Sequence, residues 1–315
     1  MILKRNFNPI KVWGYIRGQM LFALIWSSCV WQLFYWTEWQ GLGINFTPVG
    51  ILGSALAIFV AFRNQSAYAR WWEARTLWGG IVNSSRILAR LVITFADSHS
   101  HQTSFDAERA SRFKQSQIYK MIAWCHTLRM HLRRQADWPS LQPLLSEAEY
   151  EVVQKSHNKP NQILLLMGRQ LYQAMADGTL GGFDSFQIEG QLAALANHQG
   201  GCERIKNTPL PRQYDYFTRL FVLIFAGMLP FGLLGFFIPE PLHLSVWLIV
   251  PITAIIVGVF AIMERTGAAI EDPFEDLVTD VPLSALCNTI ERDLREMLGE
   301  TNLLPKLEPV DGYLQ

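Results

Sequence analysis

The chain has 315 residues, of which 50% are apolar and 17% are charged, and its 27 Lys and Arg residues balance its 27 Asp and Glu residues. This balance, without any stripe of basic residues, speaks against a nucleic-acid partner, and the length alone would allow two soluble domains. The apolar residues are unevenly distributed, however. They gather into four runs at residues 20–36, 46–62, 216–239 and 242–263.

The four runs predict membrane-spanning helices, because a bilayer is crossed by about 17–25 apolar residues in helical form. Buried helices of a soluble protein are the competing interpretation, which four such runs in one chain disfavour. The first run begins too late, and is too long, for a cleavable signal peptide. We therefore expect an all-α membrane protein with four transmembrane helices.

Basic residues predict the orientation of these helices. The loops "TEWQGLGINF" (37–46) and "PEPLH" (239–243) contain no Lys or Arg. By the positive-inside rule both loops lie outside, and both termini lie in the cytoplasm. The basic residues that support this lie before the first run and after the second: Lys4, Arg5, Lys11, Arg17, Arg63, Arg70 and Arg75.

The cytoplasmic part is predicted to be a large helical region built from residues 63–215 and 264–315, within a single domain over 1–315. Apolar residues recur at helical spacing and no alternating pattern suggests a sheet. Helices are expected at 64–96, from about 107 to Arg134, at 162–177, at 186–199 and at 284–298, with prolines breaking the segment between the second and third. A single subunit with four membrane spans would form a poor transport pathway across the bilayer, so an oligomer is expected.

Signatures of catalysis are missing from the sequence, which contains no HExxH, P-loop or GxSxG motif. His126 and His131 are five residues apart, a poor spacing for joint metal binding on a helix. His99 and His101 lie in a polar loop, and "GTLGGF" (178–183) is expected to be a turn. An enzyme is thus the least favoured class, and no metal or cofactor is expected.

Four cysteines occur in the chain, and no two have CxxC spacing. All would lie in a membrane helix or on the cytoplasmic side, so free thiols are expected. They are Cys29, Cys125, Cys202 and Cys287.

The second run carries two stripes with a spacing of four residues. Gly53, Ala57 and Ala61 form a small-residue stripe that would let helices approach closely. Ser54, Ile58 and Phe62 form another stripe, and spacing alone does not separate ordinary helix packing from a pore lining. A passive pore needs no charge within the membrane, whereas a coupled carrier usually needs ionisable groups there. Broken helices at prolines in the later runs would still permit a carrier.

Three blocks of sequence closely resemble the bacterial branch of the bestrophin family. They are "AIFVAFRNQSAYARWWEARTLWGGIVNSSRILAR" (57–90), "GCERIKNTPLPRQY" (201–214) and "AIEDPFED" (269–276), and "RWW" is also present in the animal members. The resemblance implies a homopentameric channel with one central pore. Its narrow neck would be lined by Ser54, Ile58 and Phe62. The family usually carries bulky residues at all three neck positions, so Ser54 is a departure.

The resemblance also implies a second constriction in the cytoplasmic region. Matching "LGG" (180–182) places it at Ile188, and matching backwards from Cys202 places it at Phe186. The other motif residues are interpreted as architecture, with the tryptophans at the membrane interface and arginines pairing with carboxylates. These residues are Arg70, Trp71, Trp72, Glu73, Arg75, Pro209, Pro211, Asp272, Pro273 and Phe274.

Calcium activation is not expected, because the run of consecutive acidic residues found in animal members is missing. Here "EDLVTD" (275–280) spreads its three carboxylates, whereas calcium prefers six to eight oxygens from clustered ligands. The leading hypothesis is a homopentameric channel for small monovalent ions in a bacterial inner membrane, with cations slightly favoured and lipids and ions as partners. A secondary carrier for a small anion or metabolite is the alternative, and a membrane-bound scaffold is a third interpretation.

Overall fold

The computed structural model describes residues 1–4, 9–98, 100, 105–238 and 245–314, with the side chains of residues 9–12 left out. Within this part of the chain the secondary structure is helical apart from two isolated β-bridges at Tyr313. The α-helices are α1 (Pro9–Thr37), α2 (Phe46–Ser98), α3 (Ala107–Arg133), α4 (Glu147–Lys155), α5 (Lys159–Ala176), α6 (Gly182–Asn207), α7 (Arg212–Phe237), α8 (Ile249–Ile270) and α9 (Leu283–Met297). Three short 3₁₀ helices join them: Gln40–Leu42, Trp138–Leu144 and Val246–Leu248.

Among the described residues, four helices are long and apolar enough to cross a membrane, as the four runs predict. They are α1, α2, α7 and, with the 3₁₀ turn before it, α8. Helix α2 is unbroken for 53 residues, since Gly79 and Gly80 lie inside it without interrupting it. The second run at 46–62 and the helix expected at 64–96 therefore form one continuous helix.

The chain forms two compact units, which we describe separately. The span unit comprises residues Lys4–Arg70 and Pro209–Asp272, and the second unit comprises Met1–Leu3, Trp71–Thr208 and Pro273–Gln315. Each unit is thus assembled from pieces far apart in the sequence, as expected for the cytoplasmic part. A single domain over 1–315 stays a prediction.

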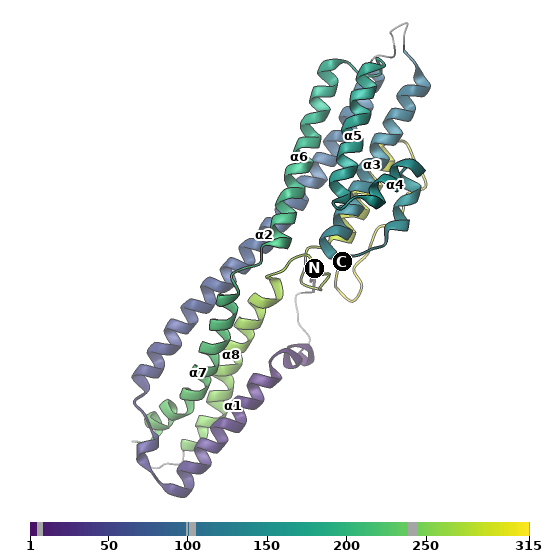
Figure 1. The fold of residues 1–315 in the computed structure, drawn as a ribbon. Coiled ribbons are helices and arrows are strands. Elements are labelled where there is room, and N and C mark those ends of the chain that lie inside the picture. Colours follow the sequence, from purple (N-terminus) through teal and green to yellow (C-terminus); the bar gives the residue numbers. More distant parts are fainter. Residues whose placement is uncertain (5–8, 99, 101–104, 239–244, 315) are drawn as a thin grey trace. The chain divides into compact units, whose positions relative to one another are not determined.

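The span unit is a bundle in which α1, α7 and α8 lie side by side (Figure 1). Its core contains large apolar side chains such as Phe225, Leu229 and Leu234 of α7 and Val257 of α8. Close approach between helices requires small residues, because a Cβ at Gly232 would collide with Val49 of α2. Many other apolar side chains in this unit are exposed, as expected for helices that face lipid.

The second unit contains the larger core, built on the buried helix α3. Helices α5 and α9 pack against α3, and α6 packs against α5 (Figure 1). Trp124, Met121 and Leu128 of α3 are fully buried. Helix starts follow from local chemistry: Asp106 accepts a hydrogen bond from the backbone of Arg109 at 3.0 Å, and Ser146 forms a capping box with Glu149.

Residues 178–181 of the glycine-rich segment form the predicted turn between α5 and α6, and Gly182 and Phe183 begin α6. Gly178 has a φ of 77°, and the N–H of Leu180 donates to the carbonyl of Ala174 at 3.0 Å, which closes the end of α5. The predicted polar loop with His99 and His101 and the predicted loop 239–243 lie outside the described residues.

Candidate functional site

The first part of α2 has one exposed face and one buried face. Ile58 and Phe62 keep 60% and 68% of their surface, and Ser54 is also exposed. On the other side Leu56 and Val60 are buried in the span unit. The predicted neck stripe is therefore uncharged and lies on a face of α2 that its own chain leaves uncovered.

The small-residue stripe is only partly used for packing within the chain. A Cβ at Gly53 would lie 2.9 Å from the ring of Phe225 on α7, so α2 and α7 touch closely there. Ala57 is half-buried and Ala61 is exposed. The expectation that this stripe packs against neighbouring helices holds within this chain at Gly53, and Ala61 shares the uncovered face with Phe62.

Arg63 follows Phe62 directly and is buried, with 2% of its surface exposed. Its Nη2 donates to Asp215 Oδ1 at 2.7 Å and to Glu271 Oε2 at 3.1 Å. Its Nη1 donates to the backbone carbonyl of Glu264 at 3.1 Å. One guanidinium thus holds α2 against the start of α7, against α8 and against the residue after α8.

Further polar contacts surround Arg63. Asn64 Nδ2 donates to the carbonyl of Met263 on α8 at 2.8 Å, and a Cβ on Gly267 would collide with Asn64 Oδ1. The buried carboxylate of Glu264 lies 3.5 Å from the Arg219 Nε. From the sequence, Arg63 was used only to orient the helices in the membrane, and this network was not predicted. The available signal was that a basic residue directly follows an uncharged apolar run.

The aromatic and charged motif after Arg63 makes contacts within each of the two units. In the span unit, Arg70 lies 3.7 Å from the Asp272 carboxylate. In the second unit, the Trp71 indole donates to the carbonyl of Thr279 at 3.1 Å, and Arg204 pairs with Glu73. These contacts support an architectural role.

The remaining motif residues differ in burial and in their place relative to the helices. Trp72 is exposed and Arg75 is half-buried. Pro209 and Pro211 precede α7, and Pro211 is the residue at its N-terminal cap. Pro273 accepts a hydrogen bond from the backbone of Val281, and Phe274 is buried in the core of the second unit.

The two alternatives for the cytoplasmic constriction differ sharply in burial, although both lie on α6. Ile188 has no exposed surface, because it is part of the core of the second unit. Phe186 is 73% exposed. A fully buried side chain cannot narrow a water-filled path, so Ile188 is set aside and Phe186 is carried forward.

The acidic residues of segment 275–280 are each engaged by donors within the second unit. Asp276 lies 2.9 Å from the Arg133 Nη1, and Glu275 lies 2.7 Å from the Lys206 Nζ. Asp280 Oδ2 accepts hydrogen bonds from the backbone N–H groups of Glu275 and Leu277. Burial raises the pKa of Asp280, which these hydrogen bonds oppose.

The histidines and cysteines of the second unit make contacts that their spacing did not reveal. His126 Nε2 lies 2.8 Å from Glu291 Oε2, whereas His131 is 3.8 Å from Glu203. The four cysteines are free thiols. Cys125 of α3 and Cys287 of α9 lie with their sulfurs 3.9 Å apart. Among the described residues, His, Cys, Asp and Glu form no cluster suited to a metal ion.

Comparisons with known proteins agree with this architecture. Residues 9–296 match the family model described as bacterial/fungal bestrophin protein. The chain is 34% identical over 298 residues to a Salmonella typhi protein named voltage-dependent anion channel-forming protein YneE, covering 95% of this chain and 91% of that protein. An Escherichia coli K12 protein with the same name is 33% identical over 298 residues, covering the same shares of both chains.

A solved structure shows the same fold. The bacterial bestrophin homologue from Klebsiella pneumoniae is 30% identical, with a TM-score of 0.78, and the match covers 92% of this chain and 100% of that one. A single-residue variant of that homologue is also 30% identical, with a TM-score of 0.80, over 92% of this chain and 98% of that one. The chain therefore belongs to the bacterial and fungal bestrophin family.

Proposed function

We propose that the protein is an ion channel whose neck is lined by Ser54, Ile58 and Phe62. The observation that carries the proposal is the uncharged, uncovered stripe on α2, in a family whose relatives are named channel-forming. An apolar ring of this kind can pass ions and close by dewetting, without a charged group in the membrane. Phe186, exposed on α6, is proposed as the second constriction.

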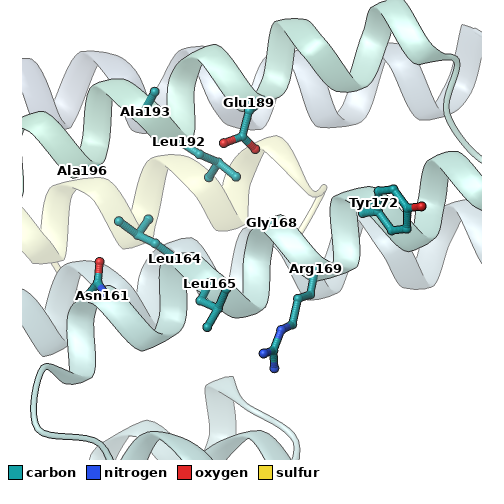
Figure 2. A pocket seen from close by; sticks show the side chains of 10 residues that line it. All are labelled: Asn161, Leu164, Leu165, Gly168, Arg169, Tyr172, Glu189, Leu192, Ala193 and Ala196. Carbon is teal, nitrogen blue, oxygen red and sulfur yellow. The ribbon is translucent and has the colours of Figure 1, made fainter.

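The channel is proposed to be a homopentamer, so that five copies of the stripe enclose one path. Exposed apolar side chains of the second unit support assembly, because they have no lipid to cover them on the cytoplasmic side. A groove of about 580 Å³ lies between α5 and α6 and is lined by Leu164, Leu165, Tyr172, Leu192 and Ala193 among others. Figure 2 shows Leu164 of α5 and Leu192 of α6 lying between the two helices. A neighbouring copy is the proposed occupant of this groove.

The proposal also includes the charge of the ions that the channel prefers. The neck is uncharged, so it provides no fixed field that selects cations or anions. We retain small monovalent cations as the preferred ions, as the resemblance to bacterial members implies. Anions are the second candidate, because the relatives from Salmonella and Escherichia coli are named anion channel-forming proteins.

Calcium activation is not part of the proposal. Glu275 and Asp276 are paired with Lys206 and Arg133, and Asp280 binds backbone N–H groups. Binding calcium there would require these pairs to break before six to eight oxygens could gather. Currents are expected to be unchanged by micromolar calcium, and a steep calcium dependence would overturn this point.

The test is current from purified protein in a planar bilayer with a tenfold KCl gradient. Discrete steps establish a channel, and the sign of the reversal potential identifies the preferred ion. Slow, saturable uptake without steps would instead support the secondary carrier. We further propose a bacterial inner-membrane location with both termini in the cytoplasm, which protease or thiol access from each side would test.

A further inference from the structure

The buried guanidinium of Arg63 lies next to the proposed neck, and the channel function assigns it no role. Residue 62 faces outward from the chain and residue 63 faces inward, because adjacent residues on an α-helix point about 100° apart. The contacts of Arg63 therefore act at the same helical turn as the last neck side chain.

The partners of Arg63 come from three separate places in the span unit. They are Asp215 in the first turn of α7, the carbonyl of Glu264 on α8, and Glu271 just beyond α8. A guanidinium suits this arrangement, because it offers five N–H donors in a rigid planar fork. An ammonium group on a flexible stem is a compact point charge with three rotatable donors, so it fixes the directions of its partners less rigidly.

We propose that Arg63 is the positioning residue of the neck, fixing the rotation and height of the last neck turn of α2 against α7 and α8. The inference rests on the proposed channel function. It deepens that function by naming the residue that sets how the ring of Phe62 side chains is presented.

The neighbours of Phe62 on the uncovered face explain why rotation matters. Ala61 and Gln65 are both exposed beside it. A small rotation of α2 would replace part of a bulky apolar ring by a methyl group or by an amide. The neck would then become wider and more easily wetted, and larger ions would pass.

Asn64 alone does not secure this turn. It contributes one hydrogen bond, from its Nδ2 to the carbonyl of Met263 on α8, whereas the bonds to α7 and to Glu271 belong to Arg63. Removal of Arg63 would therefore remove the hydrogen bonds from α2 to α7 and to Glu271 at this level, leaving the Asn64 bond to α8 and the ring contact of Phe59 with Tyr214 on α7.

The experiment compares single channels of the full chain with those of Arg63→Gln, Arg63→Lys and Asp215→Asn. The matched control is Lys155→Gln, since Lys155 is an exposed cation of α4 that pairs only with Glu151 at 3.4 Å among the described residues. The readout is the permeability ratio of a large to a small monovalent ion of the conducted sign. This ratio is a property of each open channel and does not depend on how many channels assemble.

Arg63→Gln is expected to raise the permeability ratio roughly twofold or more, because the neck loses its fixed diameter. Arg63→Lys should recover part of the wild-type ratio, and the control should match the wild type. Asp215→Asn keeps the guanidinium and should shift the permeability ratio less, in the same direction. It tests the same inference if Arg63→Gln does not assemble. Fewer channels with an unchanged ratio would overturn the inference.

A silent wild-type protein would reject the proposed function and would still allow the inference to be tested. The rate at which a water-soluble reagent labels Phe62→Cys is then compared with and without Arg63→Gln. The background is Cys29→Ala, since Cys29 is exposed whereas the other three native cysteines are buried. A change in rate supports positioning by Arg63, and equal rates overturn it.

Discussion

Buried charge is organised differently in the two units of the molecule. In the span unit, Arg63 serves three elements at once. In the second unit, the buried Lys120 pairs with one carboxylate, that of Glu149 at 2.7 Å, and Glu291 is an anion that lies 2.8 Å from His126 and 2.9 Å from Arg295. The loss of a cation that holds two carboxylates leaves both of them without it, whereas the loss of Lys120 leaves one.

The largest loss of stability is expected when Arg63 is replaced by an apolar side chain. Arg63→Met leaves the Glu271 carboxylate buried without its closest cation, so we expect a loss of about 3–5 kcal/mol of stability. Lys120→Met should cost less, on the order of 1–2 kcal/mol, because the Glu149 side chain is one-quarter exposed and can rehydrate. Denaturant unfolding of the purified proteins at equal concentration measures both. Equal losses would contradict the comparison.

A smaller loss of stability, in the same region of the span unit, is expected from Gly267→Ala. The new methyl group would collide with the Asn64 side chain, which is held by its bond to Met263. Overpacking of this kind costs about 1–3 kcal/mol. Gly200→Ala is the control, since a Cβ there meets nothing within 4 Å and Gly200 does not line the groove between α5 and α6. Thermal unfolding in detergent should show a loss for the first variant alone.

A pH-dependent contribution is expected from the pair of His126 and Glu291. Burial alone would lower the pKa of His126, but the hydrogen bond and charge of Glu291 raise it above its ordinary value. Burial opposes the shift of Glu291 as well, yet His126 and Arg295 lower its pKa. The charged pair is thus most stabilising at pH values between the two ordinary pKa values, about 4.5 to 6.5.

Stability from His126 is fully present below its ordinary pKa and is lost as the pH rises through the raised value. Glu291 behaves oppositely, and its contribution is lost as the pH falls through its lowered pKa. His126→Gln should therefore reduce the fall in stability that begins as the pH rises above the ordinary histidine value of 6.5 and passes through the raised pKa of His126. Unfolding at several pH values measures this, and an unchanged profile would reject it.

The smallest effect on stability is expected at the uncovered face of α2. Ile58→Ala or Phe62→Ala removes side chains that are mostly exposed in the chain, so the folded subunit should lose little, within about 0.5 kcal/mol. Current should nevertheless rise, because the dewetted constriction is widened. Ala57→Leu and Ala61→Leu should instead disturb assembly. If all four variants changed the current in the same way in bilayer recordings, the pore-lining face of α2 would be wrongly assigned.

The helices could largely be predicted from the sequence, because apolar runs and cap residues act locally. The runs at 216–239 and 242–263 correspond to α7 and α8, and Asp106 and Ser146 begin their helices. Bestrophin membership was also recognisable from the three sequence blocks, and the family match confirms it.

The polar contacts could not be predicted, because they join residues far apart in the chain. Cys125 meets Cys287 across 162 positions, and nothing in their spacing indicates it. The choice between Phe186 and Ile188 depends on which side of α6 faces the core, which sequence matching alone left uncertain by two residues.

The bonds of Arg63 also impose an order on biosynthesis. Its carboxylate partners lie 152 and 208 positions later in the chain, so the second membrane helix is made long before either exists. Until Asp215 and Glu271 have been synthesised, the Arg63 guanidinium can be satisfied only by water or lipid headgroups. The span unit therefore completes its folding after most of the chain has been translated, and a nascent chain that stops before α7 would expose an unpaired cation at the membrane surface.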